Sequence, residues 1–115
     1  MKASDLMIGD YILVKPSMMP IQVAAVHNKK IGYHAATHKL NWVREGLLEP
    51  IPITPEILEK NGIRYQFGHP WWQAAEMEDG VFEIHLTEKS TMLLKYVHQL
   101  QHALKLCGIS KNIEP

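Results

Sequence analysis

The sequence lacks the features that mark several classes of protein. Its 115 residues include one cysteine, Cys107, so no internal disulfide can form and nothing marks a disulfide-stapled secreted domain. Twelve basic residues balance twelve acidic ones, and a chain without net charge has little attraction for nucleic acid or anionic membranes. No apolar run has the length of a signal peptide or a membrane span. We therefore expect a cytoplasmic protein that binds neither nucleic acid polymers nor membranes.

Catalytic signatures are missing as well. The seven glycines are dispersed and form no phosphate-binding loop. The sequence contains no nucleophile elbow and no CxxC pair. The adjacent carboxylates Glu78 and Asp79 fall in an expected turn, where such groups are usually solvated. We therefore expect a protein that is not an enzyme, with no catalytic residues, no cofactor and no bound metal.

What is present is enough apolar sequence, 46% of the residues, to bury a core. The first part of the chain is rich in short β-prone runs separated by turn residues. Five strands are expected at residues 11–15, 21–27, 31–34, 40–43 and 47–49. Short strands at this even spacing predict a small, strongly bent sheet of the SH3-like barrel type.

The pattern changes after this β-rich part. Thr54 and Pro55 are typical of the N-cap and first position of a helix, and the Asn-Gly pair at 61–62 predicts its end. A strand is expected at 63–67. Two arms at 71–77 and 81–86, joined by Glu-Asp-Gly, predict a β-hairpin.

The last element expected from the pattern is a long helix over residues 90–107, ended by Gly108. Leu93, Val97, Leu100 and Leu104 would form its buried stripe. Residues 110–115 are expected to fray. The predicted fold is thus α+β, one domain over 1–115 with a β-rich part (1–53) and a helix-hairpin-helix part (54–115).

Three segments give the chain a recognisable character: LMIGDY at 6–11, EPIPITPEILEKNG at 49–62 and YVHQLQ at 96–101. In these segments it resembles short proteins of gut Bacteroides-type bacteria and of their phages and mobile elements. The resemblance implies no particular activity and no site residues. It implies a genomic setting, since small phage proteins are often accessory factors and some are sponges that sequester nucleotide-derived signals of bacterial immunity.

Two histidines, His98 and His102, lie four residues apart on the expected C-terminal helix and would point the same way. This spacing could ligate a metal, but Gln99 stands where a metalloprotease needs a glutamate. The competing interpretation, which we favour, is a solvated or groove-lining helix flank. Lys95 and Gln101 would add polar groups beside the two rings.

The pair Trp71-Trp72 offers aromatic surface of another kind. Adjacent residues of a strand face opposite sides, so one indole should remain outside the core. An exposed indole can stack on a base, and so can the Tyr33 ring. The alternative interpretation is that the exposed ring covers the edge of the barrel or fills an oligomer interface.

These features lead to two competing functions. The first is a non-enzymatic binder of a nucleotide-like small molecule, which in a phage would be a counter-defence sponge. Its ligand-binding residues would be Tyr33, Trp71, Trp72, Lys95, His98, Gln101 and His102. The second is a protein-interaction module that docks on a host factor, and a weaker third is a His-liganded metal enzyme. The aromatic and methionine content together with the zero net charge also predicts a homodimer.

Overall fold

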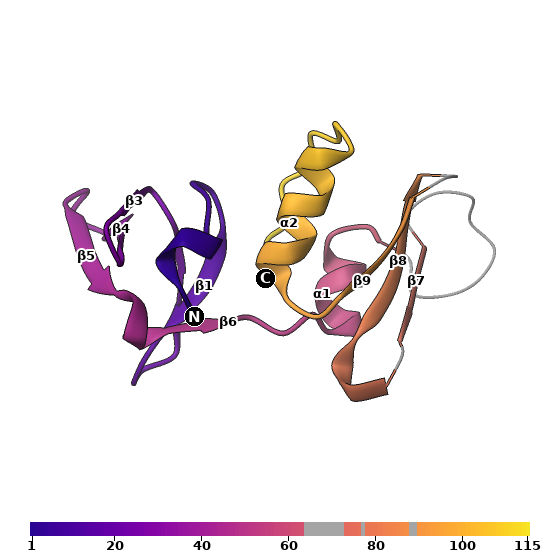
Figure 1. Ribbon diagram of the computed structural model, residues 1–115, viewed down its shortest axis with the longest axis horizontal. Coiled ribbons are helices and arrows are strands. Elements are labelled where there is room, and N and C mark those ends of the chain that lie inside the picture. The colour runs from indigo at the N-terminus through magenta and orange to yellow at the C-terminus, as the bar shows by residue number, and fades with distance from the viewer. Residues whose placement is uncertain (64–72, 77, 88–89) are drawn as a thin grey trace. The chain divides into compact units, whose positions relative to one another are not determined.

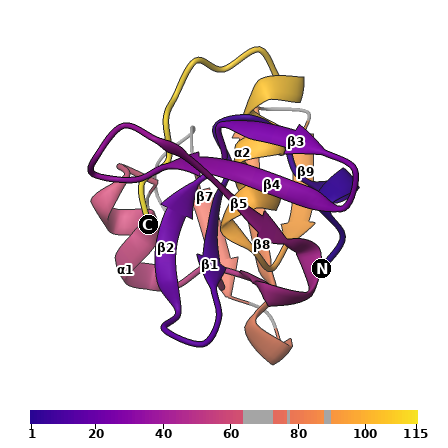
Figure 2. The ribbon, with the colours of Figure 1, turned by 90° about the vertical axis from the view of Figure 1, so that its left-hand side faces the viewer.

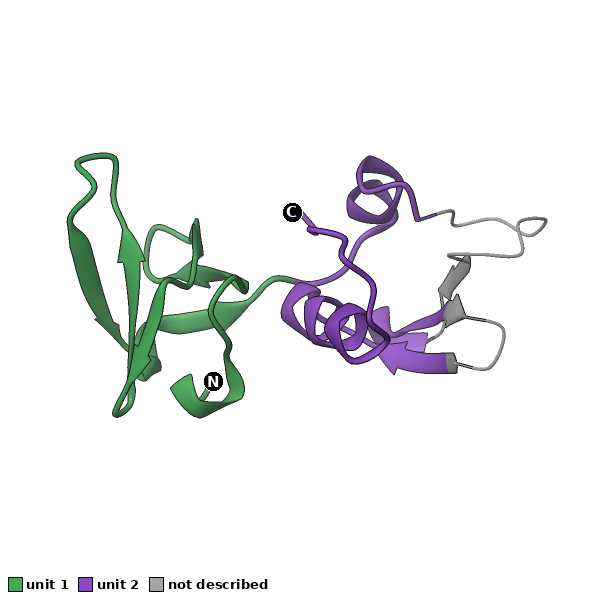
Figure 3. Cartoon of the chain, turned by 90° about the horizontal axis from the view of Figure 1, so that it is seen from above, with its two compact units in different colours: residues 1–51 green, residues 52–115 purple. Residues whose placement is uncertain are grey.

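The computed structural model describes residues 1–63, 73–76, 78–87 and 90–115. They form two compact units, Met1–Ile51 (unit 1) and Pro52–Pro115 (unit 2), shown in green and purple in Figure 3. The division lies two residues from the expected change between the β-rich and helix-containing parts. That the two units fold together as one domain stays a prediction. As a whole the chain is a mixed α+β protein with antiparallel sheets and a C-terminal helix.

Unit 1 consists of six short strands and two 3₁₀ turns. They are η1 (Ala3–Asp5), β1 (Tyr11–Val14), β2 (Met19–Gln22), β3 (Ala25–His27), β4 (Lys30–His34), β5 (Leu40–Arg44), η2 (Glu45–Leu47) and β6 (Leu48–Pro50). Two three-stranded antiparallel sheets result, with the orders β2-β1-β6 and β3-β4-β5. Figure 2 shows the second sheet crossing the first. Among the residues of this unit, all of which are described, the strands do not close into one barrel.

The expected single strand at 21–27 is wrong in detail, because the chain changes sheet within it. The Val23 N–H donates to the Asp10 carbonyl at 2.8 Å, beside β1. The next N–H, that of Ala24, donates to the Gly32 carbonyl of β4 at 2.8 Å. Two consecutive residues thus bond to different sheets, which divides the run into β2 and β3.

Asp10 holds this corner in place from a fully buried position. Its Oδ2 accepts a hydrogen bond from the Met7 N–H at 2.7 Å, while its backbone pairs with Val23. The preceding residue, Gly9, donates its N–H to the Val23 carbonyl at 2.7 Å and has a φ of 98°, which favours glycine. A buried carboxylate is tolerated where hydrogen bonds satisfy it.

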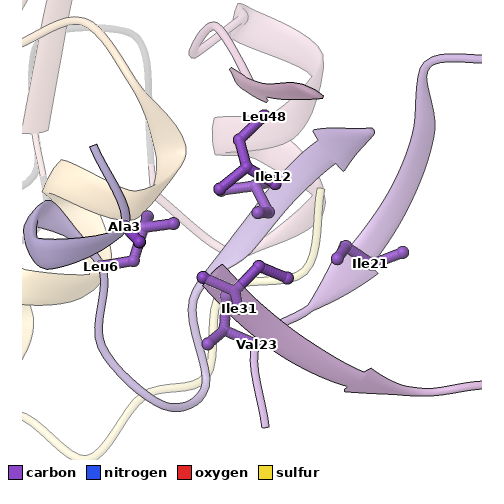
Figure 4. Close-up of a cluster of buried hydrophobic side chains, with 7 residues drawn as sticks. All are labelled: Ala3, Leu6, Ile12, Ile21, Val23, Ile31 and Leu48. Carbon is purple, nitrogen blue, oxygen red and sulfur yellow. The ribbon is translucent and has the colours of Figure 1, made fainter. Parts of the chain in front are cut away.

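The core of unit 1 fills the space between the two sheets. Its buried side chains come from η1, from both sheets and from the segments that join them (Figure 4). They are Ala3, Leu6, Ile12, Ile21, Val23, Ile31 and Leu48. Val14, Tyr33 and Val43 pack against this cluster, so one face of each sheet is apolar and covered.

Unit 2 begins with the expected short helix, α1 (Pro55–Lys60). Thr54 caps it, because its Oγ1 accepts from the Ile57 N–H at 3.2 Å. Asn61 and Gly62, the latter at a φ of 76°, end the helix as predicted. The strand expected at 63–67 lies almost wholly outside the described residues.

The predicted hairpin is confirmed in its described part, and a third strand joins it. β7 (Gln73–Glu76) pairs with β8 (Phe82–Thr87) through the turn η3 (Glu78–Gly80), and β8 also pairs with β9 (Ser90–Leu94). Phe82 and Ile84 are buried, whereas Glu83, between them, is partly exposed.

The C-terminal helix is shorter than predicted. Residues 90–94 are strand β9, and α2 comprises Val97–Leu106 (Figure 1). Leu93, expected in the helical stripe, is 65% exposed on β9, while Val97, Leu100 and Leu104 are buried as expected. Pairing with β8 overrides the helical pattern at 90–94. Across the described residues, no helix has both the length and the apolar character needed to cross a bilayer.

The prediction that residues 110–115 fray is also wrong. Ile113 is completely buried. The Asn61 amide holds the neighbouring residue, since Nδ2 donates to the Glu114 carbonyl at 2.8 Å and Oδ1 accepts from the Glu114 N–H at 2.9 Å. Asn61 Nδ2 also donates to the Ile57 carbonyl at 2.7 Å, which ties the tail to the end of α1.

This attachment makes the tail a stabilising part of unit 2. Ile113→Ala should lower the free energy of unfolding by about 2–5 kcal/mol, because it empties a fully buried site. Asn61→Ala should cost about 1–3 kcal/mol, because buried backbone groups lose their partners. Urea denaturation followed by circular dichroism measures both. The exposed neighbour provides the control: Asn112→Ala should change stability by less than about 0.5 kcal/mol, and an equal loss there would contradict the attachment.

Candidate functional site

A groove of about 420 Å³ lies in unit 1, along strand β2 and beside the end of β4. We call it the β2 groove. Its walls are residues of β2, the corner that follows it, and the chain that leaves β4. They are Met19, Pro20, Ile21, Gln22, Val23, Ala24, Tyr33, His34, Ala35 and Ala36.

The groove follows from the change of sheet at the corner. β2 is the edge strand of its sheet, so only β1 lies beside it there. The chain then turns at Val23 and Ala24 toward the other sheet, of which β4 is the central strand. Small side chains at Ala24, Ala35 and Ala36 leave the space between the two segments open.

The groove walls combine an aromatic ring, flexible apolar chains and a few polar groups. Tyr33 is half-buried with its body against the core cluster. Met19, 43% exposed, supplies an adaptable thioether. Gln22 is oriented by a hydrogen bond from its Nε2 to the Gly9 carbonyl at 3.2 Å, and His34 is exposed.

The lining of the groove offers aromatic, apolar and hydrogen-bonding contacts. Among its lining residues there is no carboxylate, serine, threonine, cysteine, lysine or arginine. A nucleophile paired with a base, or a pair of carboxylates, is what hydrolytic or transfer chemistry would require.

The four site residues predicted on the C-terminal helix lie in unit 2, around the start of α2. Tyr96 stacks on His98, with ring centroids 6.0 Å apart and planes 9° from parallel. His98 in turn meets the edge of His102 at 5.8 Å. Lys95 Nζ lies 5.8 Å from the centre of the Tyr96 ring. The rings of Tyr96, His98 and His102 therefore form a continuous row, which we call the α2 ring row.

The expectation of a solvated or groove-lining flank is wrong for His98. Its exposed fraction is 7%, as is that of Gln101, while His102 is half-buried. His98 lies between two rings, stacked on Tyr96 and edge-on to His102. The position of His98 on a helical wheel does not reveal these contacts. Lys95 is exposed, as expected for a polar residue that reaches into solvent.

The seven predicted ligand-binding residues thus fall into three groups. Tyr33 lies in the β2 groove of unit 1, and Lys95, His98, Gln101 and His102 lie together in unit 2. Trp71 and Trp72 lie outside the described residues. The groove residues Met19, Gln22 and His34 were not predicted, although Pro20 within a β-prone run could have indicated an edge strand.

A metal centre would need more ligands than the helix provides. Within the parts of the chain that the structure describes, no three histidine, cysteine, aspartate or glutamate side chains come together. His98 and His102 are neighbours, but a zinc site needs at least a third protein ligand. Cys107 lies partly exposed after the last turn of α2.

Comparison with known proteins finds no matching family model, no similar curated protein and no similar solved structure.

The α2 ring row is expected to contribute to stability. His98→Ala should lower the free energy of unfolding by about 1–3 kcal/mol, because it removes a buried ring from between two others. His98→Phe, which keeps a flat ring in that position, should recover most of the loss. Thermal or urea unfolding of the two variants measures the difference. If His98→Ala were as stable as the parent, the stack would have no structural role.

Proposed function

We propose that this protein is a non-enzymatic binding protein that holds a small, nucleotide-like molecule in the β2 groove. The observation that carries the proposal is the groove itself. Its volume of about 420 Å³ falls within the range of small-molecule sites, about 300–1,000 Å³. Its walls offer mixed aromatic, apolar and polar contacts without a serine, cysteine, lysine or carboxylate, which suits retention without turnover.

The ring of the ligand would carry most of the binding. Tyr33 provides an aromatic face, and Met19 can adapt to the opposite side of a bound ring. The Gln22 amide and the His34 imidazole can exchange hydrogen bonds with a base edge. Because no lysine or arginine lines the groove, phosphates on the ligand would project into solvent rather than be clamped.

Within the setting implied by the resemblance to phage and mobile-element proteins, such a binder would act as a sponge. A sponge removes a nucleotide-derived immune signal by binding it intact.

We propose for unit 1 the SH3-like architecture in particular. In support, β2 and β3 behave as two halves of one bent strand, the first paired with β1 and the second with β4, and η2 precedes β6.

The ligand proposal is tested by incubating the protein with cyclic dinucleotides and ADP-ribose-type signals, followed by heat release and chromatography. We expect one of them to be recovered intact and to raise the melting temperature. Tyr33→Leu should weaken its binding about ten-fold or more, since a stacked base is worth roughly 1–3 kcal/mol.

The matched control is Trp42→Leu, which removes an exposed ring of the same sheet that does not line the groove. It should leave the affinity for the recovered ligand unchanged, and a loss of affinity there would place the ligand outside the β2 groove and overturn the proposal. Retention of no compound, with no thermal shift, would overturn the proposal. Recovery of an altered product would indicate an enzyme instead.

A second candidate function, docking of a protein partner, is favoured by the edge position of β2. An extended peptide could add to that edge as a further strand, as in other cases of β-strand addition. Met18 and Met19, 46% and 43% exposed, would contact its side chains. Pro20 lacks an N–H, so the added strand could bond only to the remaining backbone groups of β2.

We also propose that the protein is a homodimer. Large apolar side chains with more than a third of their surface exposed occur in both units, among them Ile8, Leu47 and Leu106. Zero net charge adds little repulsion between copies. Light scattering coupled to size exclusion should give twice the chain mass at micromolar concentration. A monomeric mass there would end this idea.

A further inference from the structure

The β3-β4-β5 sheet has a second face, which points away from the core of unit 1. Ile31, Tyr33 and Val43 pack inward, so the residues that alternate with them along β4 and β5 point outward. The register adds the outward residues of β3 to the same face. We call this surface the cationic face; its exposed side chains are His27, Lys30, His34, Leu40, Trp42 and Arg44.

Charge is distributed unevenly along the chain, although the total is zero. Residues 11–44, which include all of β1 to β5, contain no aspartate or glutamate. The same stretch contains four lysines, one arginine and three histidines. Unit 1 as a whole has six basic and four acidic residues, and unit 2 has six and eight. A balanced total therefore conceals a basic segment in unit 1.

The register places the basic groups of the cationic face side by side. His27 on β3 pairs with Lys30 on β4, and Lys30 pairs with Arg44 on β5. Like charges directly opposite each other destabilise a sheet. Among the described residues neither Lys30 nor Arg44 forms an ion pair. Lys15, by contrast, pairs with Glu49 on the other sheet.

Within the described part of the chain, the nearest carboxylate in sequence forms no ion pair with Lys30 or Arg44. Glu45 directly follows Arg44, but its Oε2 accepts a hydrogen bond from the Ala3 N–H at 2.9 Å. An anion from outside the protein would offset the repulsion between Lys30 and Arg44. A phosphate is the anion that two neighbouring cations of this kind bind well.

An exposed aromatic ring lies next to these cations. Trp42 is 48% exposed, and the edge of the His27 ring approaches it with centroids 6.3 Å apart. The two residues come from β5 and β3, so they meet across β4. Gly32 of β4 pairs with Trp42, and the Leu40 side chain lies over it, since a Cβ at Gly32 would come within 2.9 Å of that side chain. The exposed part of the Trp42 indole can stack on a base.

We propose that the cationic face binds single-stranded nucleic acid, with a base stacked on Trp42 and a neighbouring phosphate held between Lys30 and Arg44, which lie opposite each other two residues along the strands from Trp42. Aromatic platforms flanked by basic side chains are the usual means of binding single strands without sequence preference. His34 belongs both to this face and to the lining of the β2 groove. Lys30, Trp42 and Arg44 do not line the groove, so the proposal does not depend on the ligand proposed there.

The test is fluorescence anisotropy with a labelled oligo-dT and a labelled oligo-U, titrated at several salt concentrations. Trp42→Leu should weaken binding about ten-fold or more without changing the salt dependence, whereas Trp42→Phe should largely restore it. Lys30→Gln and Arg44→Gln should each weaken binding and reduce the slope of log K against log salt by about 0.7. These side chains are exposed, so the melting temperature should stay close to that of the parent.

Lys15→Gln is the matched control, because it removes the same charge from a lysine that Glu49 already neutralises. Its affinity and salt slope should equal those of the parent. The proposal is overturned if neither oligonucleotide binds, or if Trp42→Leu binds as well as the parent. It is also overturned if duplex DNA or polyglutamate competes as strongly as the single strands, since either result would indicate attraction to any polyanion.

Discussion

The hydrogen-bonded corner between Asp10 and Val23 is the constraint on which unit 1 depends. Asp10 accepts from Met7 through its buried carboxylate and from Val23 through its carbonyl, and Gly9 donates to Val23. One residue later, Ala24 bonds to the other sheet. Both candidate surfaces follow from this change of partner. It opens the β2 groove beside the corner, and it sends β3 into a sheet whose outer face is left without acidic groups.

Unit 2 depends in the same way on a few backbone contacts between distant segments. The Ile53 N–H donates to the Lys95 carbonyl at 2.9 Å, and Pro52 forms a bridge with Tyr96. The start of the unit is thereby joined to the start of α2. Gln99 completes this junction, because its Oε1 accepts from the Lys95 and Tyr96 N–H groups at 3.0 and 3.1 Å. A polar side chain in the first helical turn thus sets where α2 begins.

Local signals in the sequence predicted the elements that local chemistry decides. Thr54, Pro55 and Gly62 mark the ends of α1 because capping and backbone freedom act over a few residues. The start of α2 was wrong because Leu93, Val97, Leu100 and Leu104 fit a helical stripe, whereas pairing of residues 90–94 with β8 is a tertiary contact. The same limit applies to the candidate sites. Tyr33 was found as an aromatic residue, but the groove beside it depends on a change of sheet that no spacing encodes.

Net charge is a property of the whole chain and does not describe how charge is distributed over one surface. Attraction to an anion a few ångströms away depends on charges within about one Debye length, roughly 10 Å at 0.1 M salt. Unit 1, all of which the structure describes, itself has six basic and four acidic residues, and none of its carboxylates forms an ion pair with Lys30 or Arg44. A sheet also brings residues far apart in sequence into one row, as it does with His27, Lys30 and Arg44. Binding at this face therefore has to be judged from the register of three strands, and that register favours an anionic partner.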